Sequence, residues 1–272
     1  MQVTSQPYFK ANAPTLRSAV DCTTAQRTVF IVLPAYNEQD ALGPLLEGVR
    51  ETFEPAGLTY LVVVVDDGSS DDTARVASQA SFSMPVELIS HPENQGLAAA
   101  LRTGLSAALA LSRPGDAIVT MDSDNTHPPR LIPDMLELLR GDRDVVIASR
   151  FQPGAEVVGV PMARVFFSVG ARCLFQMAFP IQGVRDYTCG YRAYRAEALQ
   201  QAADHYGDSL ISETGFSCMA DLLLKLRRLP LAMAEIPLEL RYDRRGAGSK
   251  MRVLRTIRQT VWLILRRRFG RL

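Results

Sequence analysis

Two carboxylates that follow an apolar run form the strongest chemical signal in the sequence. Residues 118–121 are Ile-Val-Thr-Met, and Asp122 and Asp124 come directly after them, separated by Ser123. A short apolar run bounded by turn residues predicts a buried strand, and open α/β sheets bind ligands beyond the carboxyl ends of their strands. Carboxylate oxygens suit Mg²⁺ or Mn²⁺. The pattern predicts a metal at Asp122 and Asp124 that bridges a diphosphate, whereas an isolated Asp-x-Asp pair is more often a solvated turn.

Two earlier apolar runs, at 29–33 and 61–65, also end in polar residues. Parallel strands bring such ends to the same edge of a sheet as Asp122 and Asp124. Acids gathered at one edge repel each other unless cations or N–H donors balance them. A metal ion and a nucleotide base would do so, with Asp66 accepting from a base N–H. Taken alone, the polar residues after the second predicted strand are explained equally well as a turn followed by a helix cap. The residues that directly follow these two runs include Pro34, Tyr36, Glu38, Asp66 and Asp67.

Strands and helices alternate along the first part of the chain, which predicts an α/β fold with a mostly parallel sheet flanked by helices. Gly96 precedes a predicted helix at 97–111 and lets the backbone approach a ligand. A further helix is predicted at 132–140. The predicted strands lie at 29–33, 61–65, 86–90, 117–121 and 145–149.

The second part of the chain has a weaker pattern. Segment 161–179 is apolar with isolated arginines and has no assigned element. The further predicted elements are a turn and strand within 186–194, a helix at 216–227, a strand at 234–242 and a basic helix at 251–269. Because no linker is visible, we predict one α/β domain with a C-terminal extension packed on it, preceded by a mobile or loosely docked arm. These parts are an N-terminal arm at 1–27, an α/β domain at 28–250 and a basic amphipathic C-terminal helix at 251–272.

Composition restricts the function classes. The 272 residues are 47% hydrophobic and 22% charged, as in globular proteins that bury a core, and the net charge of +1 gives no field that would favour nucleic acid. The four cysteines have no metal-type spacing, so we expect reduced thiols. No secretory signal is visible, and no apolar run reaches the roughly 20 residues that span a bilayer. We expect a cytoplasmic protein, soluble or peripheral to the membrane.

The C-terminal segment alternates apolar residues with arginines from Met251 onward. Such a helix can lie on an anionic bilayer. It can equally dock on the core and present a solvated basic face. The sequence leaves this choice open, and it does not specify an oligomeric state.

Taken together and in order, the motifs resemble the family 2 glycosyltransferases, which have the nucleotide-sugar-binding α/β fold called GT-A. The segments that carry this resemblance are Pro34–Glu38, Asp66–Thr73, Asn94–Leu97 and Asp122–Asp124. Four others resemble the polyprenyl-phosphate (dolichol-phosphate) subgroup: His127–Pro129, Ser149–Phe151, Asp186–Arg192 and Arg244–Lys250.

The resemblance implies an inverting, metal-dependent transfer from a GDP- or UDP-linked sugar to a polyprenyl phosphate at the inner face of the membrane. A divalent cation stabilises the charge on the leaving phosphate, and arginine forks suit an anionic acceptor. Thr126 stands where many relatives carry Gln, so the third metal ligand is open. The residues implied as catalytic are Asp124 and Arg150. Those implied in nucleotide-sugar binding are Pro34, Tyr36, Glu38, Asp66, Asp67, Asn94, Gly96, Asp122 and Ser123. Those implied in acceptor-phosphate binding are Arg150, Arg164, Arg192, Arg244 and Lys250.

Three alternatives compete with this interpretation. A family 2 transferase can act on a polysaccharide, a protein or a small molecule, and differs only in its acceptor half. An inactive, membrane-docked binding module would turn over no sugar nucleotide. A nucleotide-binding dehydrogenase needs Gly-x-Gly-x-x-Gly after the first strand, and Pro34–Glu38 contains no glycine. Each arginine taken singly is more often a surface or ion-pair residue, except Arg150 at a strand end.

Overall fold

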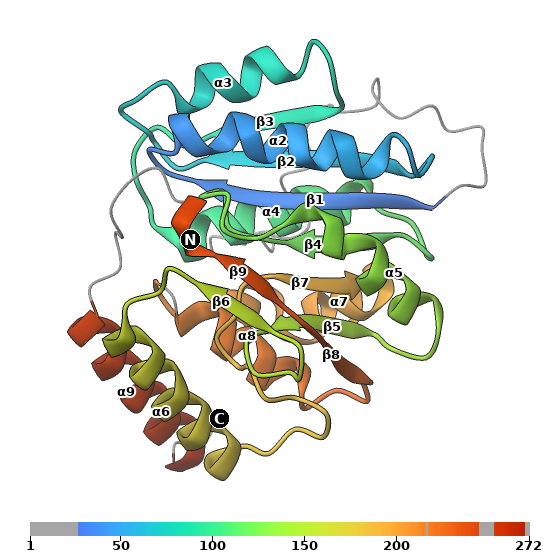
Figure 1. Ribbon diagram of the computed structural model, residues 1–272. Helices are drawn as coiled ribbons and strands as arrows, with labels where there is room; N and C mark the ends of the chain where they lie inside the picture. Colours follow the sequence, from blue (N-terminus) through green and yellow to red (C-terminus); the bar gives the residue numbers. More distant parts are fainter. Residues whose placement is uncertain (1–26, 216, 245–252, 270–272) are drawn as a thin grey trace, which may run out of the picture.

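A seven-stranded, mostly parallel sheet forms the centre of the computed structural model, which describes residues 27–215, 217–244 and 253–269 (Figure 1). The strand order is β3-β2-β1-β4-β7-β5-β8, and β7 runs antiparallel to its neighbours β4 and β5. The predicted α/β fold is confirmed. The strands are β1 (Thr28–Ala35), β2 (Thr59–Asp66), β3 (Val86–Ser90), β4 (Ala117–Thr120), β5 (Val145–Ser149), β7 (Arg192–Arg195) and β8 (Met233–Pro237).

Helices cover both faces of this sheet, which explains why its central strands are apolar throughout rather than alternating. In Figure 1, α2, α3 and α5 lie on one face and α4, α7 and α8 on the other. Their bounds are α2 (Gln39–Phe53), α3 (Thr73–Ala80), α4 (Leu97–Leu111), α5 (Ile132–Arg140), α7 (Ala196–Tyr206) and α8 (Ser217–Leu226), with a short 3₁₀ turn η1 (Pro129–Leu131) before α5 and another, η2 (Gly207–Ile211), after α7.

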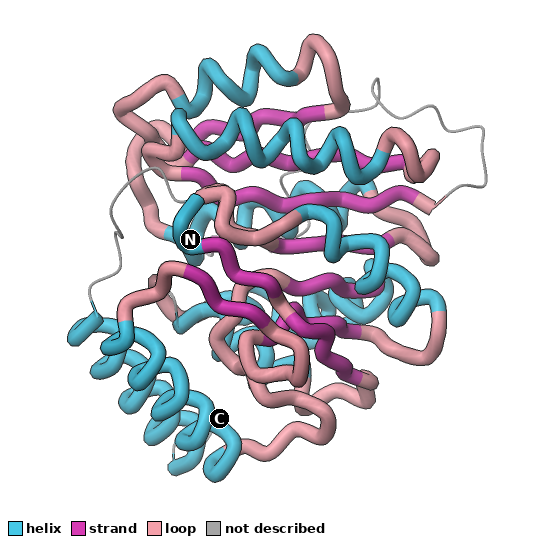
Figure 2. Tube along the Cα trace, viewed as in Figure 1, coloured by secondary structure: helices cyan, strands magenta, loops and turns pink. Residues whose placement is uncertain are grey.

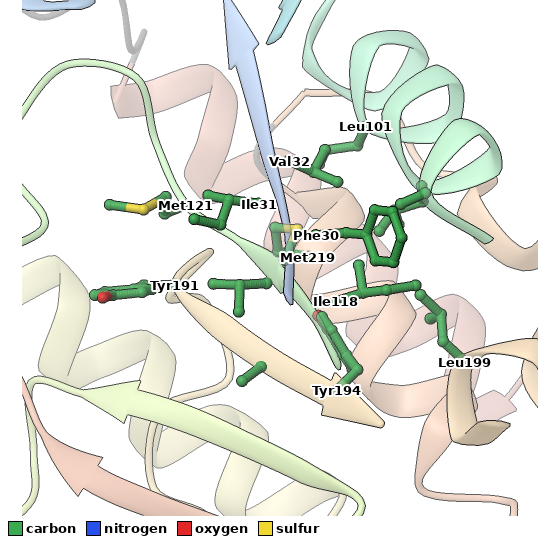
Figure 3. Packing of buried hydrophobic residues seen from close by; sticks show 14 of the residues in the cluster. Phe30, Ile31, Val32, Leu101, Ile118, Met121, Tyr191, Tyr194, Leu199 and Met219 are labelled. Atoms are coloured by element: carbon green, nitrogen blue, oxygen red, sulfur yellow. The ribbon is translucent and has the colours of Figure 1, made fainter. Parts of the chain in front are cut away.

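The core lies between the sheet and these helices. Figure 3 shows Phe30, Val32 and Leu101 packed where α4 crosses β1. Gly104 permits this crossing, because a Cβ atom there would lie 2.4 Å from Val32 Cγ1. The close approach of α4 fixes the loop that precedes it, and that loop belongs to the candidate site.

A second, two-stranded sheet joins β6 (Glu156–Val158) to β9 (Glu239–Arg241). The single strand predicted at 234–242 is therefore wrong, because the chain leaves the main sheet after β8 and changes partners. The Leu238 amide donates to Ser149 O at 2.9 Å, and the Arg241 amide donates to Thr126 O at 3.0 Å. The strand is divided because its two parts pair with different neighbouring strands. A run of alternating residues does not reveal these neighbours. A short 3₁₀ turn, η3 (Tyr242–Arg244), follows.

Two long helices, α6 (Met162–Ala178) and α9 (Val253–Phe269), lie side by side at one end of the molecule (Figures 1 and 2). The sequence marked the α6 region only as apolar, and α7 and β6 had no prediction. The helix predicted at 251–269 matches α9 from Val253 onward, and the arm predicted at 1–27 lies outside the described residues except for Arg27.

Helix α9 docks on α8 as well as on α6. Leu263 is fully buried, and a buried charge cluster joins the two helices. The carboxylate of Asp221 accepts from Arg267 Nε at 2.8 Å and from Lys225 Nζ at 2.7 Å. No helix in the described part of the chain is long and apolar enough to cross a membrane.

Candidate active site

The carboxyl ends of β1, β2 and β4 meet at one edge of the sheet. The three strands are parallel neighbours, and Ala35 pairs with Asp66 in the register of β1 and β2. Ser123 Oγ donates to Pro34 O at 2.7 Å, which ties the end of β4 to the end of β1. The structure thus brings together the three polar runs that the sequence placed at one edge.

The ends of β1 and β2 are joined by reciprocal hydrogen bonds. The Asn37 amide donates to Ser69 Oγ at 2.9 Å, and Asn37 Oδ1 accepts from the Ser70 amide at 2.8 Å. Asp66 is 4% exposed, and its Oδ1 accepts from the Ser69 amide at 3.2 Å. Tyr36, 36% exposed, and the half-buried Glu38 stand beside this junction. Asp66 is therefore held by its own turn at the predicted nucleotide edge.

Asp67 organises the loop between β3 and α4. Its carboxylate accepts from the Gln95 amide at 3.0 Å and the Gly96 amide at 2.7 Å, and pairs with His91 Nδ1 at 2.7 Å. His91 Nε2 continues to Thr103 Oγ1 at 3.0 Å. These contacts make Asp67 the residue that holds the 91–96 loop, and its predicted role in nucleotide binding stays a prediction.

The loop that Asp67 holds carries two of the predicted nucleotide residues. Asn94 is exposed and Gly96 half-buried, with φ of 89° at Gly96. Gly68, with φ of 68°, packs so closely that a Cβ atom would lie 2.4 Å from the Glu93 carbonyl carbon. His91 was missed by the sequence reasoning; its position directly after a predicted strand was the available signal.

The turn after β4 aims the two predicted metal ligands. Asp124, 7% exposed, accepts at Oδ1 from the Thr126 amide at 3.2 Å and from Thr126 Oγ1 at 2.6 Å. The Asp122 amide donates to His127 Nδ1 at 3.2 Å, and the His127 ring stacks on Tyr191 with centroids 5.1 Å apart. Thr126 thus orients Asp124 through its hydroxyl.

The carboxylates of Asp122 and Asp124 are suitable ligands for a divalent metal ion. Among the described residues no group of three or more His, Cys, Asp or Glu side chains could hold a metal ion. Asp122 and Asp124 offer only carboxylate oxygens, and a Cβ atom at Gly190 would lie 3.3 Å from Asp122 Oδ1, so the backbone leaves room there. Two carboxylates fit Mg²⁺ or Mn²⁺, because such ions keep waters and take substrate phosphates as their remaining ligands.

Arg150 directly follows β5 and is clamped by a buried carboxylate. Its Nε and Nη2 donate to Asp186 Oδ2 and Oδ1 at 2.8 and 2.7 Å, and Nη2 also donates to Thr188 Oγ1 at 2.6 Å. Asp186 is fully buried, whereas the Arg150 side chain is 21% exposed. Burial alone would raise the pKa of Asp186, but the charge and hydrogen bonds of Arg150 outweigh it and hold that pKa at about 2.

Arg150 also experiences the charge of Asp122, one of the two predicted metal ligands. Burial would lower its pKa, but Asp186 raises it, and the Asp122 carboxylate adds to that effect. Asp122 therefore acts electrostatically on Arg150. The Arg150 guanidinium lies 5.6 Å from the centre of the Phe151 ring, and that of Arg172, from α6, lies 4.9 Å from it. Asp186 and Arg172 were not singled out from the sequence, since both act through pairs formed in the fold.

The structure contradicts the predicted acceptor role of Arg192. Its side chain is fully buried, with Nη1 donating to Met219 O at 2.7 Å and Nη2 to Tyr187 O at 2.9 Å. These bonds enclose the guanidinium in the core, where an acceptor phosphate has no access. The side chains of Arg164 and Arg244 and all of Lys250 lie outside the described part of the structure.

A family model described as "Glycosyl transferase family 2" matches residues 30–202. The chain belongs to this family. Dolichol-phosphate mannosyltransferase of Pyrococcus furiosus is 32% identical over 198 residues, 72% of this chain and 52% of that protein. Undecaprenyl-phosphate mannosyltransferase of Micrococcus luteus is 32% identical over 224 residues, 82% of this chain and 87% of that protein. The chain therefore spans about half the length of the Pyrococcus relative and most of the Micrococcus one.

Solved structures support the same fold. Glucosyl-3-phosphoglycerate synthase of Mycobacterium tuberculosis, in complex with Mn²⁺, UDP and glucosyl-3-phosphoglycerate, matches with a TM-score of 0.61 and 25% identity, covering 90% of this chain and 80% of that one. The family resemblance drawn from the sequence motifs is thus confirmed.

Proposed function

We propose that this family 2 member is an inverting, metal-dependent glycosyltransferase that moves a sugar from a nucleoside diphosphate to a polyprenyl phosphate. The observation that carries the proposal is that the carboxyl ends of β1, β2 and β4 meet at one edge of the sheet, where the charge of Asp122 also acts on the clamped Arg150. This arrangement supports a single site for the proposed diphosphate and a fixed guanidinium. A leaving diphosphate and an incoming phosphate can then face the same anomeric carbon.

The reaction follows from these positions. An oxygen of the acceptor phosphate attacks the anomeric carbon while the bond from that carbon to the β-phosphate oxygen breaks, and a single in-line step inverts the centre. The divalent cation supplies stabilisation of the negative charge that develops on the β-phosphate. Asp122 and Asp124 would hold it, with Asp124 aimed by Thr126. Arg150 binds and orients the acceptor phosphate. Because this phosphate is already anionic, no general base is required.

The donor is a GDP- or UDP-linked sugar whose base meets Asp66, with Pro34, Tyr36, Glu38 and Asn94 around it. The relatives named as mannosyltransferases favour a mannosyl group. Asp67 contributes by holding the 91–96 loop.

The acceptor's lipid chain points to a site of action at the inner, cytoplasmic face of the membrane. Helices α6 and α9 expose large apolar side chains at one end of the molecule, beside Arg172 and Phe151. Exposed arginines follow on α9, which suits anionic lipid headgroups. The exposed apolar side chains include Met162, Phe166, Phe167, Met177, Trp262 and Leu265.

A transfer assay tests the proposal. Purified protein is incubated with radiolabelled GDP-mannose or a UDP-sugar, with undecaprenyl phosphate as acceptor, in the presence of Mn²⁺ or of EDTA. We expect label in the lipid phase only with metal. A protein that hydrolyses or transfers no sugar from any nucleotide, and that no nucleoside diphosphate stabilises thermally, would instead be the inactive binding module.

A non-lipid acceptor is the second candidate, favoured by the structural match to a synthase crystallised with a phosphoglycerate product. That acceptor is also an anion that Arg150 can bind. The same assay with 3-phosphoglycerate in place of the lipid separates the two, since label would appear in a water-soluble product.

A further inference from the structure

A second carboxylate, half-buried, lies behind the Asp186–Arg150 pair. Glu235, on β8, accepts at Oε1 from the Arg185 amide at 2.7 Å and from the Asp186 amide at 2.6 Å. Burial raises the pKa of Glu235, and the negative charge of Asp186 adds to the increase, although the two amides oppose it. Like charges placed close together repel each other, and the two amide hydrogen bonds to Oε1 offset this repulsion.

The two amides belong to the turn that presents Asp186. From this turn the Asp186 carboxylate receives the Arg150 side chain and also the amides of Thr188 and Cys189, at 3.2 and 3.0 Å. The Arg185 side chain reaches Phe151 O at 3.3 Å. The turn is therefore fixed to the 150–151 segment from both of its residues, and Glu235 holds it from behind.

We propose that Glu235 is a positioning residue for the acceptor phosphate. It fixes the 185–186 turn, the turn fixes Asp186, and Asp186 directs Arg150 to the acceptor. This inference rests on the proposed function, in which Arg150 binds that phosphate. If Oε1 is lost as a hydrogen-bond acceptor, the amide N–H groups of Arg185 and Asp186 lose their partner. The turn then shifts, and the Arg150 side chain is no longer held in one direction.

Three variants and one matched control test the chain of contacts. Glu235→Ala removes the oxygen that accepts the two amide hydrogen bonds, and Glu235→Asp moves it away by one methylene. Glu235→Gln keeps an oxygen that can accept both hydrogen bonds. The control is Asp144→Ala. Asp144 Oδ2 accepts from the Ala232 amide at 2.8 Å. Asp144 directly precedes β5, whereas Arg150 directly follows it, so the control lies at the opposite end of this strand.

We expect Glu235→Ala to raise KM for polyprenyl phosphate by about tenfold, with KM for the sugar nucleotide unchanged. Glu235→Asp should be intermediate, and Glu235→Gln should restore acceptor KM to within about threefold of wild type. Asp144→Ala should lower Tm while leaving both KM values unchanged. The inference is overturned if Glu235→Ala raises both KM values alike, if it behaves as the Asp144 variant does, or if Gln fails to restore acceptor KM.

A measurement that needs no turnover separates this inference from the proposed function. The Nε–H of Arg150, assigned in ¹H–¹⁵N spectra by comparison with Arg150→Lys, should exchange slowly with solvent in the wild type and in Glu235→Gln. It should exchange at least about tenfold faster in Glu235→Ala. If wild type uses no polyprenyl phosphate, the proposed function fails. A loss of protection in the Ala variant alone still supports the positioning role, and unchanged protection overturns it.

Discussion

The donor half and the acceptor half of the site hold their charged groups in different ways. On the donor side, Asp66 and Asp124 are each held by residues two or three positions further along the chain, Ser69 and Thr126. On the acceptor side, Arg150 is held by Asp186, 36 residues away. Asp66 and Asp124, on the proposed donor side, are thus held within their own turns, whereas Arg150, on the proposed acceptor side, is held by a buried carboxylate from a distant element.

The difference has an energetic consequence. A carboxylate in a turn that loses a hydroxyl or amide partner remains close to solvent or to its ligand. A buried ion pair that loses one partner leaves an uncompensated charge, which destabilises by several kcal/mol. Substitutions on the donor side should therefore reduce activity more than stability, and those on the acceptor side should reduce both.

The largest expected effect is on donor chemistry. Asp124→Ala removes one of two proposed metal ligands, and we expect the transfer rate to fall by about a thousandfold, or about 4 kcal/mol of transition-state stabilisation. The free energy of unfolding should change by less than about 1 kcal/mol. The rate is measured with radiolabelled donor, and stability by urea denaturation. Asp40→Asn, an exposed acid on α2, is the control and should change neither. A variant that keeps its rate but unfolds easily would reverse the comparison.

The same contrast decides what the sequence could predict. Strand tips at 34–38, 66–69 and 122–124 were found because a strand followed by its own turn is a local pattern, and parallel order then brings the tips together. Asp186 was only the first residue of a motif, without a role, and Glu235 was not noticed, because the partners of both are far away in the sequence. Arg192 was misassigned for the same reason, since composition alone does not reveal that a guanidinium is enclosed by carbonyl groups.

The cost of breaking a buried charge pair can be tested away from the site, at the α8–α9 contact. Asp221→Ala leaves both Lys225 and Arg267 without their carboxylate, and we expect a loss of about 3 kcal/mol in the free energy of unfolding. Hydrogen exchange should locate the opening in α9.

Its control is an exposed pair. Asp72 and Arg75 bridge at 2.8 Å with both side chains more than half exposed, so Asp72→Ala should cost less than about 1 kcal/mol. Equal losses of stability in the two variants would show that burial does not decide how much an ion pair of this protein contributes, and the expected stability cost at Asp186 would lose its basis.

Backbone packing on the donor side should give a smaller effect. Gly68→Ala places a Cβ against the Glu93 backbone at 2.4 Å, whereas the Cβ of Gly57→Ala meets nothing within 4 Å. Both glycines have positive φ, 68° and 62°, so each substitution strains the backbone by about 1 kcal/mol. Only Gly68→Ala should lower the free energy of unfolding further, by about 2 kcal/mol in all. It alone should also weaken nucleotide binding in a thermal-shift titration. If the two variants bind nucleotide equally well, the 91–96 loop does not contribute to the donor site.

The smallest expected effect is the pH dependence of the acceptor clamp. The pKa of Asp186 in the fold, about 2, lies below its ordinary value of 3.8, so the unfolded chain takes up a proton first as the pH falls. The clamp's contribution is complete above about pH 5 and declines toward pH 2, by about 1 kcal/mol between pH 4 and pH 3. Urea midpoints of Asp186→Asn, which takes up no proton there, should fall less steeply than those of wild type. Asp40→Asn should follow wild type, because an exposed acid lacks the clamp; parallel slopes in all three proteins would mean that Arg150 and Asp186 do not act as a buried pair.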